Sequence, residues 1–305
     1  MAMKTHVLRL AGTLLLCLFP LLAIHSQEGE ISLRMMTYNI HHGAGTDDVV
    51  DLDKQAAVIR DALPDVVGLQ EVDSCVKRSS YKPQAALLGS KTGMYATFGG
   101  AIPLTGGKYG VAILSKEAPL SHRNIPLPGN EKRTLLVCEF QEYVFATTHL
   151  DLDEECRLSS LDIILEEAAR WDKPFFICGD WNDTPTSTLI KKMKKSFRFL
   201  SYVTNTSAYY TFPAKSPSKI IDYIVAYGRI VNAIKSRQVI NEPSASDHRP
   251  VLVEATFNSY TTGIEPPSAG GASAKEGEVY NLMGCRVGET VQRGIFVQNG
   301  RKILK

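Results

Sequence analysis

The sequence carries little net charge of either sign. Its 34 lysine and arginine residues nearly balance its 32 aspartate and glutamate residues, which leaves a net charge of +2. Lys4 and Arg9 account for this excess, because residues 1–26 hold no acidic residue and the remainder is close to neutral. Nonspecific binding to nucleic acid draws most of its affinity from neutralised phosphates. The charge balance therefore disfavours nucleic acid as the partner, and the lysine-rich stretch 191–195 indicates a solvated helix face.

Cysteine is also scarce, and its spacing fits neither a zinc site nor a C-x-x-C redox motif. One of the six cysteines, Cys17, lies in the N-terminal apolar run, which leaves an odd number in the rest of the chain. The sequence indicates no particular disulfide. Cys138 and Cys178 lie in apolar, strand-like runs, where free cysteine packs as a small apolar side chain.

Long apolar runs are absent apart from Leu10–Ile24. This run follows Lys4 and Arg9, is too short to span a bilayer comfortably, and is followed by polar residues. We predict that residues 1–26 are a secretory signal peptide, with no transmembrane span left after its cleavage. An uncleaved N-terminal anchor is the alternative. The expected location is extracytoplasmic, in the periplasm, at the cell surface or in the medium.

Strand-like runs dominate the middle of the chain, while apolar residues recur at helical spacing over 52–63 and 158–169. The runs are rich in Val, Ile and Phe and are bounded by turn-forming residues. Several follow one another directly, which favours an α+β fold of two packed sheets flanked by helices over a doubly wound parallel sheet. The predicted strands are 32–40, 65–71, 109–114, 134–140, 144–149, 175–180, 220–226 and 251–257.

Composition changes after residue 257. Residues 258–277 are rich in Gly, Ser and Pro and are typical of a linker. A short β-rich tail is predicted over 278–305. The catalytic domain is therefore expected to span 27–257, as a monomer.

Polar side chains gather where the predicted strands end. Sheets hold such residues rigidly while the adjoining loops leave them open to substrate. Any one of these acids could instead be a helix cap or a turn former. Together they supply the carboxylates, imidazoles and amides that a phosphoryl-transfer site needs. They are Asn39, Glu71, His149, Asp151, Asp180, Asn182, Asp222, Asp247 and His248.

Seven short motifs occur in an informative order: TYNI (37–40), LQE (69–71), GVAILS (110–115), THLD (148–151), GDWND (179–183), IDYI (221–224) and SDHRP (246–250). With these motifs the chain resembles the endonuclease/exonuclease/phosphatase superfamily, which includes DNase I-like nucleases and secreted sphingomyelinases. The resemblance implies a DNase I-like four-layer α/β/β/α sandwich with its site at one end of two facing sheets.

The resemblance also implies a metal site. Glu71 is expected to be the principal ligand, with Asn39 and Asp247 close to the metal. The expected ion is Mg²⁺, with Mn²⁺ as a substitute, because a hard cation takes carboxylate, amide and water oxygens.

The catalytic residues carried over from the same motifs are His149, Asp180, Asn182, Asp222 and His248. Asp180 is expected to orient or deprotonate the attacking water, and His248 to meet a phosphoryl oxygen while Asp222 orients it. Asn182 and His149 are also expected to contact the substrate phosphate. Beyond this set, Arg133 and Tyr109 could reach a phosphate. His41 and His42 could line the pocket or form a solvated turn.

The expected substrate is a small-molecule or lipid-headgroup phosphoester. The core of about 230 residues leaves little room for the groove-entering loops of nucleases, and no long aromatic hairpin suggests membrane penetration. A secreted DNase I-like nuclease is the alternative enzyme. A non-catalytic exported binding module on the same fold is the alternative of a different class.

Overall fold

The structure, a computed structural model, describes residues 29–259 and, in the C-terminal part, 279–280, 295–298 and 301–304. The chain divides into two units, residues 1–260 and 261–305. The predicted signal peptide and nearly all of the predicted linker lie outside the described residues, so both stay predictions. No described helix is long and apolar enough to cross a membrane.

The first sheet has two parallel strands at its centre, β1 (Glu30–Asn39) and β2 (Val66–Ser74), each with an antiparallel neighbour on its other side. Helix α1 (Leu52–Ala62) connects the two central strands. The sheet order is β11 (Val231–Val239), β12 (Val251–Asn258), β1, β2, β4 (Gly107–Ser115) and β3 (Tyr95–Leu104).

The second sheet repeats this plan. Parallel strands β7 (Val144–His149) and β8 (Phe175–Asp180) lie at its centre and are connected through helix α3 (Glu154–Ala168). The sheet order is β5 (Ser121–Leu127), β6 (Arg133–Glu139), β7, β8, β10 (Asp222–Tyr227) and β9 (Phe197–Phe199).

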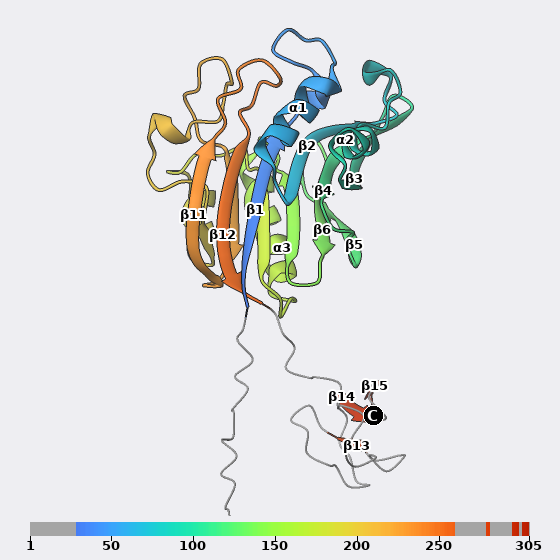
Figure 1. Ribbon diagram of the computed structural model, residues 1–305, viewed down its shortest axis with the longest axis vertical. Helices are drawn as coiled ribbons and strands as arrows, with labels where there is room; N and C mark the ends of the chain where they lie inside the picture. Colours follow the sequence, from blue (N-terminus) through green and yellow to red (C-terminus); the bar gives the residue numbers. More distant parts are fainter. Residues whose placement is uncertain (1–28, 260–278, 281–294, 299–300, 305) are drawn as a thin grey trace, which may run out of the picture. The chain divides into compact units, whose positions relative to one another are not determined.

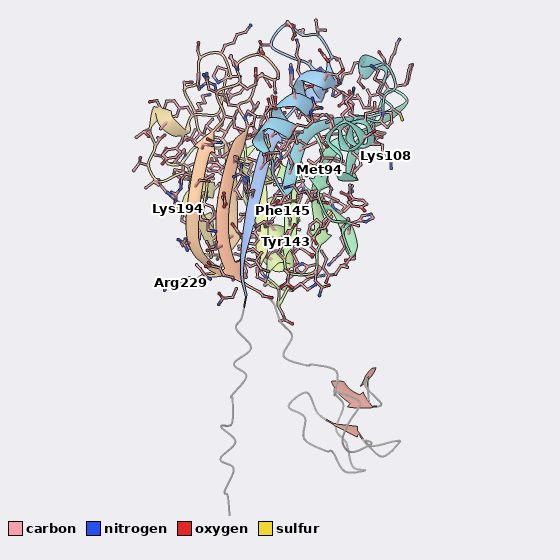
Figure 2. All side chains as sticks on the ribbon, viewed as in Figure 1. Met94, Lys108, Tyr143, Phe145, Lys194 and Arg229 are labelled. Atoms are coloured by element: carbon pink, nitrogen blue, oxygen red, sulfur yellow. The ribbon has the colours of Figure 1, made fainter. Side chains whose placement is uncertain are left out.

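Helices cover the outer faces of both sheets. Helices α1 and α2 (Gln84–Thr92) lie on the first sheet, and α3 and α4 (Thr188–Met193) lie on the second (Figure 1). Three apolar clusters fill the three interfaces, and the middle one, which includes Tyr143 and Phe145, lies between the sheets (Figure 2). Four layers packed in this order confirm the α/β/β/α sandwich.

Short 3-10 helices occur at η1 (His41–Gly43), η2 (Lys77–Ser79) and η3 (Ser207–Tyr209).

The described pieces of the tail form a small antiparallel sheet. Its strands are β13 (Val279–Tyr280), β14 (Ile295–Gln298) and β15 (Arg301–Leu304), with β14 in the middle. This agrees with the β-rich character that its sequence indicates.

The two large sheets approach closely at Gly68 of β2. A Cβ atom at this position would lie 2.2 Å from Sγ of Cys178 and 2.6 Å from Oγ1 of Thr147, both on the second sheet. Beside it, Gln70 donates a hydrogen bond of 2.8 Å to the same Thr147 hydroxyl. Asn39, which ends β1, and Glu71, three residues after Gly68 on β2, lie near this contact, so the close approach helps to set the distance between the two halves of the site.

Replacement of Gly68 by alanine is expected to lower the free energy of unfolding by about 1–3 kcal/mol, since overpacking forces neighbouring groups to move. Urea unfolding measures the loss. The matched control is Gly29→Ala, where a Cβ would meet nothing within 4 Å, and where the free energy should stay within about 0.5 kcal/mol. Equal stability of the two variants would contradict the close approach.

Candidate active site

A row of three polar side chains crosses the second sheet. His149 of β7 pairs in register with Asp180 of β8, and Asp180 pairs with Asp222 of β10. Parallel strands β7 and β8 end at this row and antiparallel β10 begins there, so all three side chains belong to one edge of the sheet. Strand pairing thus brings together residues that lie more than 70 positions apart.

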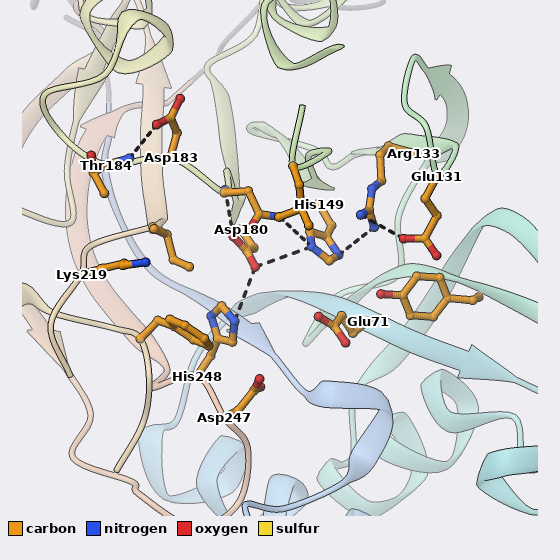
Figure 3. A pocket seen from close by; sticks show the side chains of 15 residues that line it. Glu71, Glu131, Arg133, His149, Asp180, Asp183, Thr184, Lys219, Asp247 and His248 are labelled. Carbon is orange, nitrogen blue, oxygen red and sulfur yellow. Dashed lines mark hydrogen bonds and ion pairs between the residues drawn. The ribbon is translucent and has the colours of Figure 1, made fainter. Parts of the chain in front are cut away.

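His248, in the turn before β12, lies between two carboxylates. Its Nδ1 is 3.0 Å from Oδ2 of Asp222. Its Nε2 is 3.6 Å from Oδ2 of Asp180, a contact that Figure 3 shows. The ring of Phe212 packs against it, with the ring centroids 4.7 Å apart. Burial opposes a charge on His248, but the two carboxylates outweigh it and raise its pKa to about 10. The imidazole is therefore a cation at neutral pH.

Asp180 lies at the centre of the site. Its Oδ1 accepts the backbone N–H of Asn182 at 2.9 Å, and its Oδ2 accepts Nδ2 of Asn39 at 3.1 Å. Nε2 of His149 lies 3.6 Å from the same Oδ2. Burial raises the pKa of the Asp180 carboxyl to about 7, against the opposing charge of His248. A carboxyl with a pKa near neutrality is well suited to take a proton from water.

Asn182 and His149 also lie next to Asp180. Nδ2 of Asn182 donates to the carbonyl of Leu150 at 2.9 Å and lies 3.1 Å from Nε2 of His149. Nη1 of Arg133 lies 3.4 Å from the other ring nitrogen. Burial and the nearby positive charges of Arg133 and His248 hold the pKa of His149 well below its usual value, so its ring is neutral.

The first sheet contributes Asn39 and Glu71. Asn39 ends β1, and its Nδ2 donates to Oε1 of Glu71 at 3.0 Å as well as to Asp180, which links the two sheets. Glu71 lies where the register of β2 against β4 shifts between Leu69 and Val72, and its φ is 57°. Such bulges re-aim side chains beside active sites.

The site opens into one cavity of about 470 Å³. Glu71 and Asp247 both line it (Figure 3), and neither forms an ion pair with a described residue. Two carboxylates that face one cavity, and that pair with no cationic side chain among the described residues, fit the predicted metal site. The lining residues are Glu71, Tyr109, Glu131, Arg133, His149, Leu152, Asp180, Asn182, Asp183, Thr184, Phe212, Lys219, Ile221, Asp247 and His248.

Arg133 and Tyr109, which were expected to come within reach of a phosphate, both line the cavity. Arg133 is 7% exposed and forms a 2.9 Å ion pair with Glu131. Lys219 adds a cation to the opposite wall (Figure 3). The cavity therefore offers positive groups on two sides of the central carboxylates.

Asp151, one of the acids at the strand ends, does not line the cavity. Its side chain accepts the backbone N–H groups of Glu131 and Asp153, so it acts as a turn former. Arg157 supports the same region by donating to the carbonyl of Asp151 and pairing with Asp183 at 3.2 Å. These contacts fix the loops that follow β7 and β8.

Two groups of side chains bring three potential metal-ligand atoms within 4.8 Å of one another. One group is Asp180, Asp222 and His248, and the other is His41, His42 and Glu71. The four cysteines among the described residues are free.

The structure brings together all eight residues predicted for the site, from the row across the second sheet, the loop after β8, strands β1 and β2, and the turn before β12. Sequence reasoning did not identify Phe212 and Lys219 as part of it. They pair across a turn as an isolated bridge, and no motif marks them. Trp181, within the GDWND motif, is fully buried in the apolar cluster beneath α3 and α4.

Comparison with known proteins identifies relatives of the first unit. A sequence model described as the Endonuclease/Exonuclease/phosphatase family matches residues 36–248. A comparison with curated proteins gave no match.

Solved structures share the fold. An endonuclease/exonuclease/phosphatase from Beutenbergia cavernae aligns with a TM-score of 0.60 at 21% identity, covering 90% of this chain and 92% of that one. A mannosyl-6-phosphatase from Bacteroides thetaiotaomicron aligns with a TM-score of 0.60 at 18% identity, over 74% and 100% of the two chains. The human Nocturnin catalytic domain with bound sulfate aligns with a TM-score of 0.57 at 21% identity, over 76% and 97%. Because the family match spans well over half of the sequence, the chain belongs to the endonuclease/exonuclease/phosphatase family.

Proposed function

We propose that the chain is an exported, Mg²⁺-dependent phosphoesterase that hydrolyses a small-molecule or lipid-headgroup phosphoester. The observation that carries this proposal is the position of Asp180, which is buried among two imidazoles and two asparagines at the edge of a cavity. Family membership supports the reaction class, since the family comprises nucleases and phosphatases.

Glu71, Asp247 and Asn39 would hold the metal. Glu71 and Asp247 face the cavity as unpaired carboxylates, and oxygen donors of this kind suit Mg²⁺. When bound, Mg²⁺ supplies a Lewis acid that polarises the phosphoryl group. The Asn39 amide, which donates to both Glu71 and Asp180, keeps the metal-binding carboxylate and the central carboxylate at a fixed spacing.

The protein's own groups divide the remaining chemistry. Asp180 orients water and accepts its proton, because its raised pKa makes it a stronger base than an ordinary aspartate. His248, held as a cation by Asp222, stabilises negative charge on a phosphoryl oxygen. Neutral His149 and Asn182 would contact the phosphate, with Arg133 behind them.

The size and charge of the cavity support a small substrate. About 470 Å³ accommodates a phosphate and a modest attached group. Both carboxylates and cationic side chains line it, whereas a nucleic-acid groove needs a continuous positive surface. The name of one structural neighbour, a mannosyl-6-phosphatase, places sugar phosphates among the substrates to test. Export is inferred from the N-terminal sequence alone.

Removal of divalent metal with EDTA is expected to abolish hydrolysis, and added Mg²⁺ should restore it, with Mn²⁺ as a substitute. The purified protein is assayed on a sugar phosphate, a chromogenic phosphodiester, sphingomyelin and plasmid DNA. Preference for either of the first two or for sphingomyelin supports the proposal, while preference for DNA favours the nuclease. No activity on any of them, together with a melting temperature that Mg²⁺ does not change, would point to a non-catalytic binding module.

A further inference from the structure

The short 3-10 helix η1 (His41–Gly43), directly after β1, has an unusual backbone. His41 and His42 have φ angles of 46° and 43°, and Gly43 follows with 80°. Left-handed conformations are unfavourable for residues with a Cβ atom. Two consecutive residues with such strained backbone angles persist only where the surrounding structure fixes them. Strain of this kind clusters at functional sites.

Gln84, the first residue of α2, fixes this turn to the strand that carries Glu71. Its side-chain amide donates to the carbonyl of His42, and its Oε1 accepts the backbone N–H of Asp73 at 2.9 Å. The Asn39 side chain accepts the backbone N–H of His41 at 3.1 Å. The two histidines are therefore held beside Glu71 by buried amides on both sides.

Each of the two imidazoles has one buried ring nitrogen without a hydrogen-bond partner. Nδ1 of His41 and Nδ1 of His42 are both shielded from solvent, and neither meets a donor or acceptor among the described residues. The rings lie edge to face, with their centroids 4.4 Å apart. One nitrogen of each ring and a carboxylate oxygen of Glu71 lie within 4.8 Å of one another. A buried polar atom without a partner is uncommon and calls for an explanation.

We propose that His41, His42 and Glu71 form a second metal site, which takes a divalent transition metal of the Zn²⁺ class. Two imidazole nitrogens and one carboxylate oxygen make up a ligand set used by catalytic zinc sites, which leave a further position open. Mg²⁺ prefers oxygen ligands and would not compete for the two nitrogens. A bound cation supplies the partner that the imidazoles lack.

To bind an ion, the three side chains need only bring their ligand atoms closer together. Tetrahedral coordination at bond lengths of about 2.1 Å places donor atoms about 3.4 Å apart, compared with the present limit of 4.8 Å. Rotation of the two rings and of the Glu71 carboxylate supplies this movement. The movement breaks no hydrogen bond at either Nδ1 atom, because neither atom has a partner among the described residues. The nearby Arg78 guanidinium is already paired with both oxygens of Asp73, at 2.8 and 2.9 Å.

The site goes beyond the proposed function, although it shares Glu71 with the proposed Mg²⁺ site. Its occupation would place a second cation next to the first at the mouth of the cavity. Metal binding at the histidines can be measured without any substrate, so its outcome is separate from that of the hydrolysis assays.

The test is Zn²⁺ binding to the purified protein without a polyhistidine tag, followed by calorimetry in excess Mg²⁺. One Zn²⁺ per chain is expected, and His41→Asn and His42→Asn should each weaken its binding by at least about ten-fold. Asparagine is chosen because it tolerates the left-handed backbone. The matched control is His122→Asn, on the exposed face of β5, which should bind Zn²⁺ like the unmodified protein.

Asp222→Asn distinguishes this site from the other group of potential ligands. Loss of Zn²⁺ binding in that variant, with normal binding in both histidine variants, would place the ion at Asp180, Asp222 and His248 and overturn the proposal. Absence of Zn²⁺ binding in excess Mg²⁺ would overturn it as well. Co²⁺ absorption provides a second readout, since the visible bands of a nitrogen-ligated ion should disappear in His41→Asn and His42→Asn while far-ultraviolet dichroism stays unchanged.

Discussion

Replacement of Asp180 by asparagine is expected to lower kcat/KM by about 10³-fold, within the range for loss of a general base. The carboxylate accepts hydrogen bonds on both oxygens, from Asn182 and from Asn39. An amide has one acceptor oxygen, so one of these contacts must be lost, and the group can no longer take a proton from water. The measurement is hydrolysis of the preferred substrate at saturating Mg²⁺.

The matched control for this variant is Asp162→Asn, on the exposed face of α3, which should hydrolyse substrate at the unmodified rate. Melting curves of both variants check that the fold is intact. Retention of more than about one tenth of the activity in Asp180→Asn would show that another group activates the water, and His149 would be the next candidate.

Replacement of Asp222 by asparagine is expected to lower kcat by about 10²-fold and to lower the pKa of His248. Burial already opposes the imidazolium, and Asp222 is the stronger of the two carboxylates that sustain it. Without Asp222 the ring loses its orienting partner at 3.0 Å and much of its positive charge. Less charge is then available to stabilise a phosphoryl oxygen.

The pH dependence of stability follows from the raised pKa of His248. Its pKa in the folded chain, about 10, exceeds its usual value of 6.5. The protonated ring therefore stabilises the fold fully below pH 6.5, and this contribution is lost as the pH rises through 10. Urea unfolding of metal-free protein at about pH 6 and about pH 9 should show a smaller loss in Asp222→Asn than in the unmodified chain.

Asp53→Asn serves as the control, because Asp53 is an exposed partner of Lys91 and surface ion pairs contribute little. This variant should keep the pH dependence of the unmodified chain. The same loss of stability in all three proteins would mean that the Asp222–His248 pair does not carry it.

The sequence predicted the interior strands of both large sheets but none of their edge strands. All eight predicted strands are interior strands, and two of them, β7 and β8, have the predicted bounds. The four strands without a prediction, β3, β5, β9 and β11, are the four edge strands. Interior strands are buried on both faces and are rich in apolar residues, whereas β5 and β11 expose most of their side chains and give no such signal.

The residues of the site were predictable from their motifs, but their contacts were not. Asp222 and Asp180 are neighbours only because β10 pairs with β8, and nothing local in either motif specifies that pairing. The left-handed turn at His41 and His42 likewise depends on Gln84, more than 40 positions away in the sequence.

The Asn39 amide spans the seam between the two sheets, with one contact on each side. Neither sheet alone holds both the metal-binding and the central carboxylate, and the last strands of the first sheet are synthesised after the whole of the second. Because the site needs groups from both sheets, hydrolytic activity is expected to return during refolding only after the two sheets have packed together. The time course of recovered activity therefore measures the rate of the last, most nonlocal step of folding.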